Sequence, residues 1–383
     1  MSNASLPDQA HDANSSVTGH PRSVTFVQRG RAGMEFLGSL QHYVAGAVRQ
    51  RARDDFNADP EGVALARTWT DRHNEPWSER IAKAKAVAER SPTYRYDRLM
   101  QRYVAEEVYV RGVPAAEQRR KEAEAFYAVP IKPAGGTLEL DPAIEIPAYH
   151  SETEWHLMPG GWDSYDLMGI TMGSGVGPLV FARGGFAAVE VDDDLRQQRI
   201  DVAKQFPKAS YKRIYEPGCG GFGTLWAVHT VFPEAELIGS DLSPHLLKQG
   251  HMNAERLGIP VTFKQRDARD TREPENSMDG IIMYALQHEM PVDVNVAALK
   301  EAFRILTPGG DLVMNDPPPF AAVHPLQAVV LDWDTEHRGE PFFTVTREIE
   351  WADVMKDIGF VNVEAYSLGA QGYPYVVRGS KPA

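Results

Sequence analysis

Cysteine, long apolar runs and excess positive charge are all scarce in this chain of 383 residues. The one cysteine excludes a framework of disulfides within the chain. No run of about 18 apolar residues predicts a membrane-spanning helix, and the N-terminus lacks the apolar segment of a signal peptide, so we expect a cytoplasmic protein. The net charge of −13, without a basic stripe that carries aromatic residues, argues against a nucleic-acid partner.

What the chain does contain is ordinary for a globular protein with a large core. Hydrophobic residues make up 43% and charged residues 24%. The length allows two domains. The first 22 residues are rich in Ser, Asn, Asp, His and Pro, and we expect a disordered tail there.

The most informative stretch is a glycine-rich turn with the sequence EPGCGGFG at 216–223. The residues before it, 213–215, are typical of the end of a buried strand, and 224–231 are typical of a helix. A turn between a strand and a helix lets backbone N–H groups approach a ligand closely. The turn therefore predicts a binding site.

Further strands follow, and acidic residues come just after several of them. Asp241 follows the second expected strand, Asp267 the third, and Glu289 lies in the loop after the fourth. Strands and helices that alternate in this way predict an α/β fold with a doubly wound, Rossmann-like parallel sheet. Ligands of such sheets lie beyond the carboxyl ends of the strands, where these acids fall. The expected strands are 213–215, 234–239, 260–264, 278–284, 311–315, 360–367 and 373–378.

From about residue 211 to the C-terminus the chain resembles a class I S-adenosylmethionine (SAM) dependent methyltransferase of the small-molecule type, with an N-terminal helical extension. The resemblance is carried by the E-x-G-C-G turn at 216–220, D-L-S-P at 241–244, Asp267 and L-T-P-G-G at 306–310. It implies a seven-stranded sheet whose last strand is antiparallel, and SAM as the cofactor. One departure is Phe222, which stands where the family has its third turn glycine.

The resemblance also implies a set of cofactor-binding residues. Asp241 would accept hydrogen bonds from both ribose hydroxyls. Asp267 would accept one from the adenine amino group, with the Ala268 N–H beside it, although Asp267 could instead cap a helix. Cys219 would be a small packing residue and not a nucleophile. The full set is Glu216, Gly218, Cys219, Gly220, Asp241, Leu242, Asp267, Ala268 and Tyr284.

Two other functions remain open at this level. Gly218, Gly220 and Gly223 can be aligned with the G-x-G-x-x-G turn of an NAD-dependent oxidoreductase, in which Asp241 would hold the NAD ribose. More than 200 residues precede this turn, whereas such a unit usually opens an NAD domain. A SAM-binding protein of the same fold that does not methylate is the other alternative.

The rest of the chain is divided into regions by composition and periodicity. Residues 23–148 are expected to form a helical N-terminal domain, either a lid over the substrate or a surface through which the chain forms a homodimer or larger homo-oligomer. Residues 149–205 form a connector over the active site, and 206–383 form the SAM-binding domain with a substrate-loop insert at 316–346. Helices are expected at 29–53, 75–88, 95–111 and 115–127.

The connector contains alternating polar residues and then aromatic ones. An extended chain would place His150, Glu152, Glu154 and His156 on one face, where they could bind a metal, but nothing nearby completes a ligand shell. The alternative is a solvated connector, and we predict no metal. Trp162 and Tyr165 follow and are expected to fold over SAM and substrate, or else to pack between domains.

Methyl transfer requires an acceptor held in line with the methyl carbon and the sulfur, and a base when the acceptor is a hydroxyl. His288 after the fourth strand is the first candidate for this base, and Glu289 is the second. The alternative for His288 is a residue that bonds to backbone at a helix start. Trp333 and other aromatics of the insert indicate a partly apolar acceptor. The sequence therefore predicts methyl transfer to a small organic molecule, first to oxygen and next to carbon or nitrogen.

Overall fold

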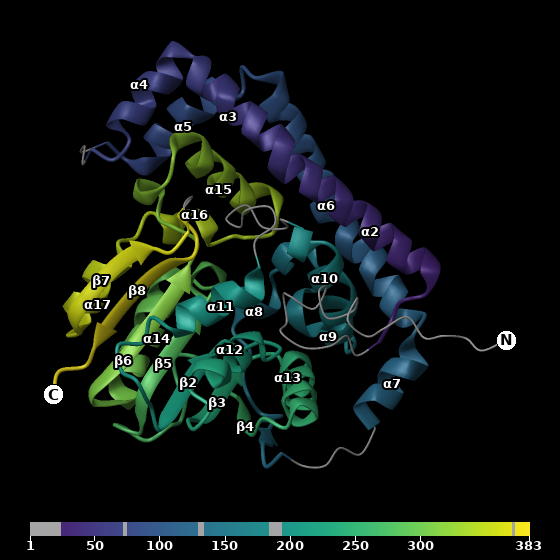
Figure 1. Cartoon of the computed structure of the whole chain (residues 1–383), viewed down its shortest axis with the longest axis vertical. Helices are drawn as coiled ribbons and strands as arrows, with labels where there is room; N and C mark the ends of the chain where they lie inside the picture. Colours follow the sequence, from purple (N-terminus) through teal and green to yellow (C-terminus); the bar gives the residue numbers. More distant parts are fainter. Residues whose placement is uncertain (1–23, 72–74, 129–133, 184–193, 370–371) are drawn as a thin grey trace.

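The computed structural model describes residues 24–71, 75–128, 134–183, 194–369 and 372–383. It contains a sheet with helices on both faces and a helical region that extends from one side of it (Figure 1). This arrangement confirms the predicted α/β class with a mostly helical N-terminal part. Residues 1–22, expected to be a disordered tail, lie outside the described residues.

The sheet has the strand order β1-β4-β3-β2-β5-β6-β8-β7. All neighbouring strands are parallel except β8, which is antiparallel to both β6 and β7. The predicted antiparallel last strand is therefore confirmed. The bounds are β1 Thr137–Glu139, β2 Arg213–Pro217, β3 Glu236–Asp241, β4 Val261–Gln265, β5 Met278–Tyr284, β6 Leu306–Asp316, β7 Val361–Ser367 and β8 Tyr375–Ser380.

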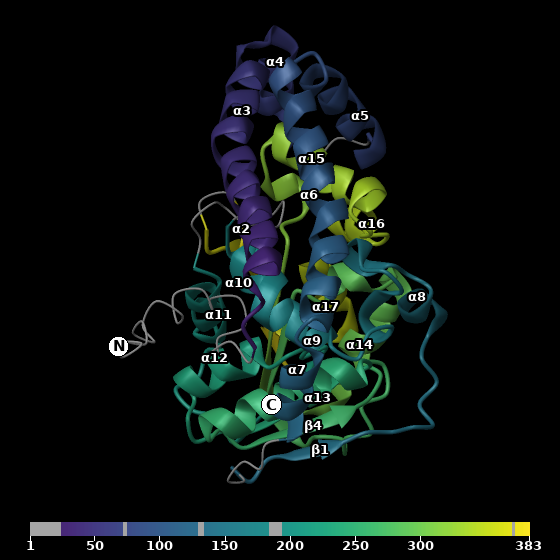
Figure 2. The same ribbon diagram turned by 90° about the vertical axis from the view of Figure 1, so that its right-hand side faces the viewer.

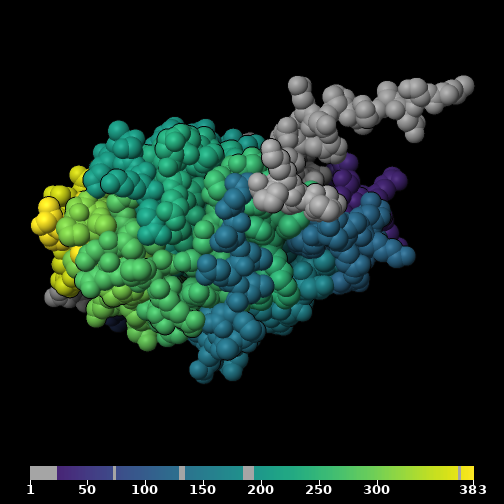
Figure 3. Space-filling model, turned by 90° about the horizontal axis from the view of Figure 1, so that it is seen from below, coloured from purple at the N-terminus to yellow at the C-terminus, as the bar shows by residue number. Residues whose placement is uncertain are grey.

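The sheet has eight strands where the sequence predicted seven. The additional strand, β1, pairs with the outer edge of β4 and comes from the chain that precedes the connector. After β1 the chain runs along the surface of the sheet domain to α8 (Figures 2 and 3). With three residues, β1 is too short for an alternating pattern to identify it in the sequence.

Helices cover both faces of the sheet, and each face has its own apolar core. One core joins Leu225 of α12 and Leu247 of α13 to strand residues such as Ile214. The opposite core joins Leu299 of α14 and Met355 of α17 to the other face of the strands. The bounds are α11 Leu195–Ala203, α12 Gly223–Val231, α13 Pro244–Leu257, η6 Gln287–Glu289, α14 Val292–Ile305 and α17 Trp351–Ile358.

The N-terminal helices form a long arm beside the sheet (Figures 1 and 2). α2, a π-helical turn and α3 follow one another without a break, and α6 packs against them. α6 begins sharply because the Ser91 hydroxyl accepts from the Tyr94 N–H and Pro92 occupies the first turn. The bounds are α2 Gln28–Tyr43, η1 Val44–Val48, α3 Arg49–Ala58, α4 Pro60–Thr68, α5 Trp77–Ala88, α6 Pro92–Glu117 and α7 Arg120–Ala128.

The described connector residues before position 184 form short helical pieces that lie between the arm and the sheet (Figure 1), and residues 184–193 lie outside the described residues. The described part of the connector shares one apolar core with the N-terminal helices and with the insert that follows β6. The insert is helical, and α15 packs against α5. The bounds are α8 Ala148–Ser151, η2 Trp155–Leu157, η3 Gly161–Asp163, α9 Met168–Thr171, η4 Met172–Val176, α10 Gly177–Leu179, η5 Phe181–Arg183, η7 Phe320–Ala322, α15 Pro325–His337 and α16 Phe343–Arg347.

Within the described ranges, none of the helices combines the length and the apolar character needed to cross a bilayer.

Candidate functional site

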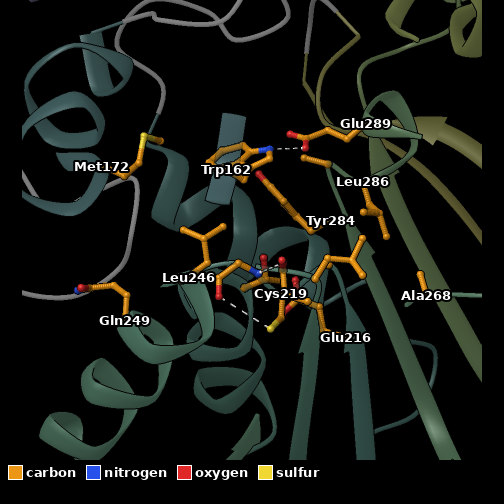
Figure 4. Close-up of a pocket in the computed structure, with 18 of the residues that line it drawn as sticks. Trp162, Met172, Glu216, Cys219, Leu246, Gln249, Ala268, Tyr284, Leu286 and Glu289 are labelled. Atoms are coloured by element: carbon orange, nitrogen blue, oxygen red, sulfur yellow. Dashed lines mark hydrogen bonds between the residues drawn. The ribbon is translucent and has the colours of Figure 1, made fainter. Parts of the chain in front are cut away.

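A cavity of about 270 Å³ lies beyond the carboxyl ends of β2, β3 and β5. Glu216 and Cys219 line it on the side of the sheet, and Trp162 of the connector lies across from them, above Tyr284 (Figure 4). Of the predicted cofactor residues, eight line this cavity: Glu216, Gly218, Cys219, Gly220, Asp241, Leu242, Ala268 and Tyr284.

At two positions of the glycine-rich turn, the backbone has a left-handed conformation that glycine adopts more easily than other residues. Gly218 has φ 66° and Gly220 has φ 51°. A Cβ at position 218 would lie 2.5 Å from Leu286 Cδ1. Phe222 also has a positive φ, 92°, and its fully buried ring packs against Phe263. The departure from the family's glycine pattern is thus a ring that anchors the start of α12.

The Asp241 carboxylate is held by backbone N–H groups on both of its oxygens. Oδ2 accepts from the Gly220 N–H at 2.9 Å and Oδ1 from the Ser243 N–H at 2.9 Å. Burial raises the pKa of Asp241, and the two donors oppose that rise. The carboxylate is therefore fixed in orientation at the end of β3, with its side chain part of the cavity wall.

Glu216, at the end of β2, is almost fully buried at 1% exposure. Its Oε2 has no hydrogen-bond partner in the described parts of the chain. Burial raises the pKa of this carboxyl well above its usual range, which favours the neutral acid. A hydrogen bond from Thr224 and the charge of Arg199 oppose this rise, and the side chain presents a polar group to the cavity.

Asp267 lies differently from the other predicted cofactor residues. Its Oδ1 accepts from the backbone N–H of Arg269 at 2.8 Å, and Oδ2 accepts from Arg269 Nη2 at 2.7 Å. It does not line the cavity, whereas its neighbours Arg266 and Ala268 do. These contacts belong to a turn, and no helix begins directly after Asp267, so the helix cap considered for this residue is absent.

A second cavity, of about 200 Å³, adjoins the first one. The two share a wall formed by Trp162, Tyr284 and Glu289. Aromatic and charged side chains line the second cavity on the side of the insert, among them His288, Asp334, Arg338, Glu340, Phe343 and Tyr373. One cavity can hold a cofactor and the other a second molecule.

His288 lines the second cavity only and is bonded to a buried carboxylate. Its Nδ1 lies 2.7 Å from Asp316 Oδ1, and Arg347 binds Asp316 Oδ2. Burial opposes the charged imidazole, but the Asp316 carboxylate outweighs it and raises the pKa of His288. Burial likewise opposes the charge of Asp316, whose pKa is nevertheless lowered by Arg347 and His288. The bond to Asp316 leaves Nε2 as the ring nitrogen that can exchange a proton.

Glu289 lies beside His288 and is held in place by the connector. Its Oε2 accepts from Trp162 Nε1 at 2.9 Å, and its Oε1 lies 3.3 Å from His156 Nε2. The other nitrogen of His156 lies 2.6 Å from Glu340 Oε1. Burial opposes a charge on His156, but the two carboxylates raise its pKa to about 10. The imidazolium thus links the loop after β5 to the insert.

Two of the predicted substrate residues line neither cavity. The Tyr165 hydroxyl donates to Glu117 Oε2 at 2.8 Å, and Trp333 packs on His337 with ring centroids 4.6 Å apart. The alternating polar residues of the connector do not form an extended strand, because 148–151 and 155–157 are helical. The described part of the chain holds no cluster of three or more His, Cys, Asp or Glu residues suited to a metal ion.

Sequence reasoning missed several residues of the site. Arg199, Glu340 and Tyr373 line the cavities, and Asp316 lies behind His288, to which it is bonded. Asp316 carried a signal, because it ends a strand at the same sheet edge as the other acids. Arg199 carried none, since it lies in a short polar helix without a motif.

Known proteins match the central part of the chain. Residues 214–310 match a family described as a methyltransferase domain. A demethylmenaquinone methyltransferase of Thermus thermophilus is 32% identical over 127 residues, which cover 33% of this chain and 56% of that protein. A trans-aconitate 2-methyltransferase of Methylobacterium radiotolerans is 28% identical over 126 residues, which cover 33% of this chain and 46% of that protein. The chain thus spans about half the length of these curated relatives. Among solved structures, an O-methyltransferase family protein from Burkholderia thailandensis is similar with a TM-score of 0.41 and 20% identity, over 53% of this chain and 60% of that one.

Proposed function

We propose that this chain, whose residues 214–310 match a methyltransferase domain, is a class I SAM-dependent methyltransferase that transfers the methyl group of SAM to an oxygen atom of a small organic acceptor. SAM is the cofactor of the domain and would occupy the cavity at the ends of β2 and β3. The observation that carries the proposal is a buried His288–Asp316 pair whose imidazole lines a second cavity that shares a wall with the first.

The shared wall supports an in-line transfer between the two cavities. The sulfonium of SAM already carries a good leaving group, so the protein needs to align the acceptor and exclude water. Trp162, Tyr284 and Glu289 border both cavities and would surround the methyl group. We therefore propose that the described part of the connector, which contains Trp162, covers the site.

The His288–Asp316 pair supports an oxygen acceptor. A hydroxyl must lose its proton as the methyl group arrives, and a positioned imidazole can take it. The Asp316 carboxylate fixes the ring and stabilises the imidazolium that forms, although Glu289, only one residue away, could serve as the base instead. An amine acceptor, neutral at the working pH, would make no use of this pair.

A small acceptor agrees with the size of the second cavity and with the names of the relatives. About 200 Å³ accommodates a molecule of modest size, and Phe343 and Tyr373 provide apolar surface for it. Two relatives are named for demethylmenaquinone and trans-aconitate, which are organic compounds and not macromolecules. The helical region at 23–148 would shape this cavity indirectly, because it shares a core with the insert.

Calorimetry with SAM, S-adenosylhomocysteine and NAD tests the cofactor. We expect binding of the first two and none of NAD. Transfer of labelled methyl from SAM to a panel of phenols, alcohols, carboxylic acids and amines then tests the acceptor atom. Binding of NAD alone would refute the proposal. Binding of SAM with transfer to amines only would refute the choice of oxygen.

A further inference from the structure

Asp334 is a buried carboxyl group in the wall of the second cavity, and it does not line the first cavity. It lies in the last turn of α15, within the insert that follows β6, and the residue is 5% exposed. Glu340 follows it in the same insert and lines the same cavity. The two carboxyl groups therefore belong to the side of the site where the acceptor is expected.

The Asp334 carboxyl group lacks a donor that a buried carboxyl group ordinarily has. Within the described ranges, its Oδ1 has no hydrogen-bond partner, and the same holds for Oε2 of Glu340. The other oxygen of Glu340 lies 2.6 Å from His156 Nδ1. Burial raises the pKa of Asp334 to about 6, so that the group is mostly charged at neutral pH. Because buried carboxylate oxygens are ordinarily satisfied, an unsatisfied one in a cavity wall indicates a donor on the ligand.

Three arginines act on Asp334 through their charges and limit the kind of donor that suits it. Arg338, Arg98 and Arg49 each oppose the rise in its pKa. Arg98 and Arg49 are paired with the buried carboxylate of Asp97, while Arg338 lines the second cavity itself. A ligand ammonium group would be repelled by these guanidiniums, whereas an uncharged donor would not. The charges therefore favour a hydroxyl over an amine as the partner of Asp334.

We propose that Asp334 accepts a hydrogen bond from a second hydroxyl group of the acceptor, so that the acceptor carries at least two hydroxyls. The first hydroxyl gives its proton to His288 as its oxygen bonds to the methyl carbon and the bond from that carbon to sulfur breaks; the second hydroxyl keeps its proton. Both residues line the second cavity, as do the rings of Phe343, Phe181 and Tyr373. An aromatic diol satisfies both ends, because its rigid ring separates the hydroxyls and packs against these side chains. Asp334 then helps to select the acceptor of the proposed methyl transfer, on which this assignment rests.

Binding of isosteric ligand pairs to Asp334→Ala tests this assignment separately from methyl transfer. Each pair consists of a fluorinated benzenediol and the difluorophenol in which fluorine replaces the second hydroxyl, a change that preserves the size but removes the donor. Ortho, meta and para pairs cover three separations of the two groups. Fluorine NMR measures the dissociation constants while S-adenosylhomocysteine fills the first cavity. Asp332→Ala is the matched control, because Asp332 lies on the same helix, accepts from Thr344 Oγ1 and lines neither cavity.

The unmutated chain should prefer the diol of at least one pair by about 10-fold or more, the range of a hydrogen bond to a charged group. Asp334→Ala should abolish this preference without changing the affinity for the difluorophenol, and Asp332→Ala should leave the preference intact. Asp334→Asn, whose amide oxygen still accepts, should retain part of it. Melting temperatures check that the variants are folded.

Three results overturn the assignment: no preference for any diol in the unmutated chain, a preference that survives in Asp334→Ala, or equal weakening of both members of a pair. The last result would leave Asp334 only as a counter-ion of the arginines. Failure to bind S-adenosylhomocysteine refutes the proposed function instead, and the same ligand pairs on the free chain still test Asp334.

Discussion

Replacement of His288 by alanine tests the proposed base directly. The ring is buried, its Nδ1 lies 2.7 Å from Asp316 Oδ1, and the residue lines the second cavity but not the first. A positioned base contributes roughly 10²–10⁴-fold, which corresponds to about 3–5 kcal/mol of the barrier. We therefore expect turnover to fall by that factor while the dissociation constant of SAM stays the same.

The pH dependence of the same reaction gives a second readout. The base must be neutral, and Asp316 raises the pKa of His288. The rate of the unmutated enzyme should then rise with pH through an ionisation above the ordinary imidazole value of about 6.5. In Asp316→Asn the carboxylate is lost while burial remains, so the ionisation should move to lower pH. In His288→Ala it should disappear.

The assay measures initial rates of methyl transfer from labelled SAM between pH 5 and 9, with calorimetry for SAM binding. His229→Ala, on α12 and in neither cavity, is the control. Thermal melting checks that Asp316→Asn is folded, because this change leaves Arg347 without its carboxylate. A His288→Ala enzyme that retains most of its rate on the true acceptor would refute the role, and Glu289 or positioning alone would have to replace it.

Three further changes test other parts of the site. Asp241→Ala should weaken SAM binding by about 2 kcal/mol or more, since it removes a carboxylate already oriented by two N–H donors. Unchanged SAM affinity in calorimetry would contradict the assignment of Asp241 to the ribose hydroxyls. Gly218→Ala should lower both the melting temperature and SAM affinity, whereas Gly221→Ala, whose added Cβ meets no protein atom within 4 Å, should leave the melting temperature unchanged. His156→Gln should destabilise the folded protein most at about pH 6 and least near pH 10. Because the pKa of His156 in the folded protein is raised to about 10, the stabilisation that its charge provides is complete below about pH 6.5 and is lost as the pH rises toward 10. Melting temperatures that differ equally at all pH values would exclude a charged His156.

The sheet, and the edge of it where the cofactor is expected, could be predicted from the sequence because the patterns that indicate them are local. The glycines of the turn, Asp241 and the apolar strands each depend on neighbours a few residues away. Their expected positions agree with β2 to β6, and the paired tail strands agree with β7 and β8. Local patterns of this kind carry most of the information about a doubly wound sheet.

The second cavity could be predicted only in part from the sequence, because its contacts join segments that are distant in the chain. His288 was recognised by its place after a strand, but its partner Asp316 lies 28 residues away, and the contact of His156 with Glu289 spans 133 residues. No spacing rule links such pairs. The alternating polar residues of the connector pointed to a shared face that its helical turns do not form.

The apolar core shared by the N-terminal helices and the insert makes the two inseparable in an expression experiment. Trp69 Nε1 donates to the Phe320 carbonyl at 2.8 Å, across 251 positions of the chain. A fragment that begins at residue 206 would lack β1, would leave the edge of β4 unpaired, and would expose the apolar side of α15. Such a fragment should aggregate, although it contains the whole glycine-rich turn. Contacts of this sequence separation also slow folding, because the entropy of closing a long loop must be overcome before they form.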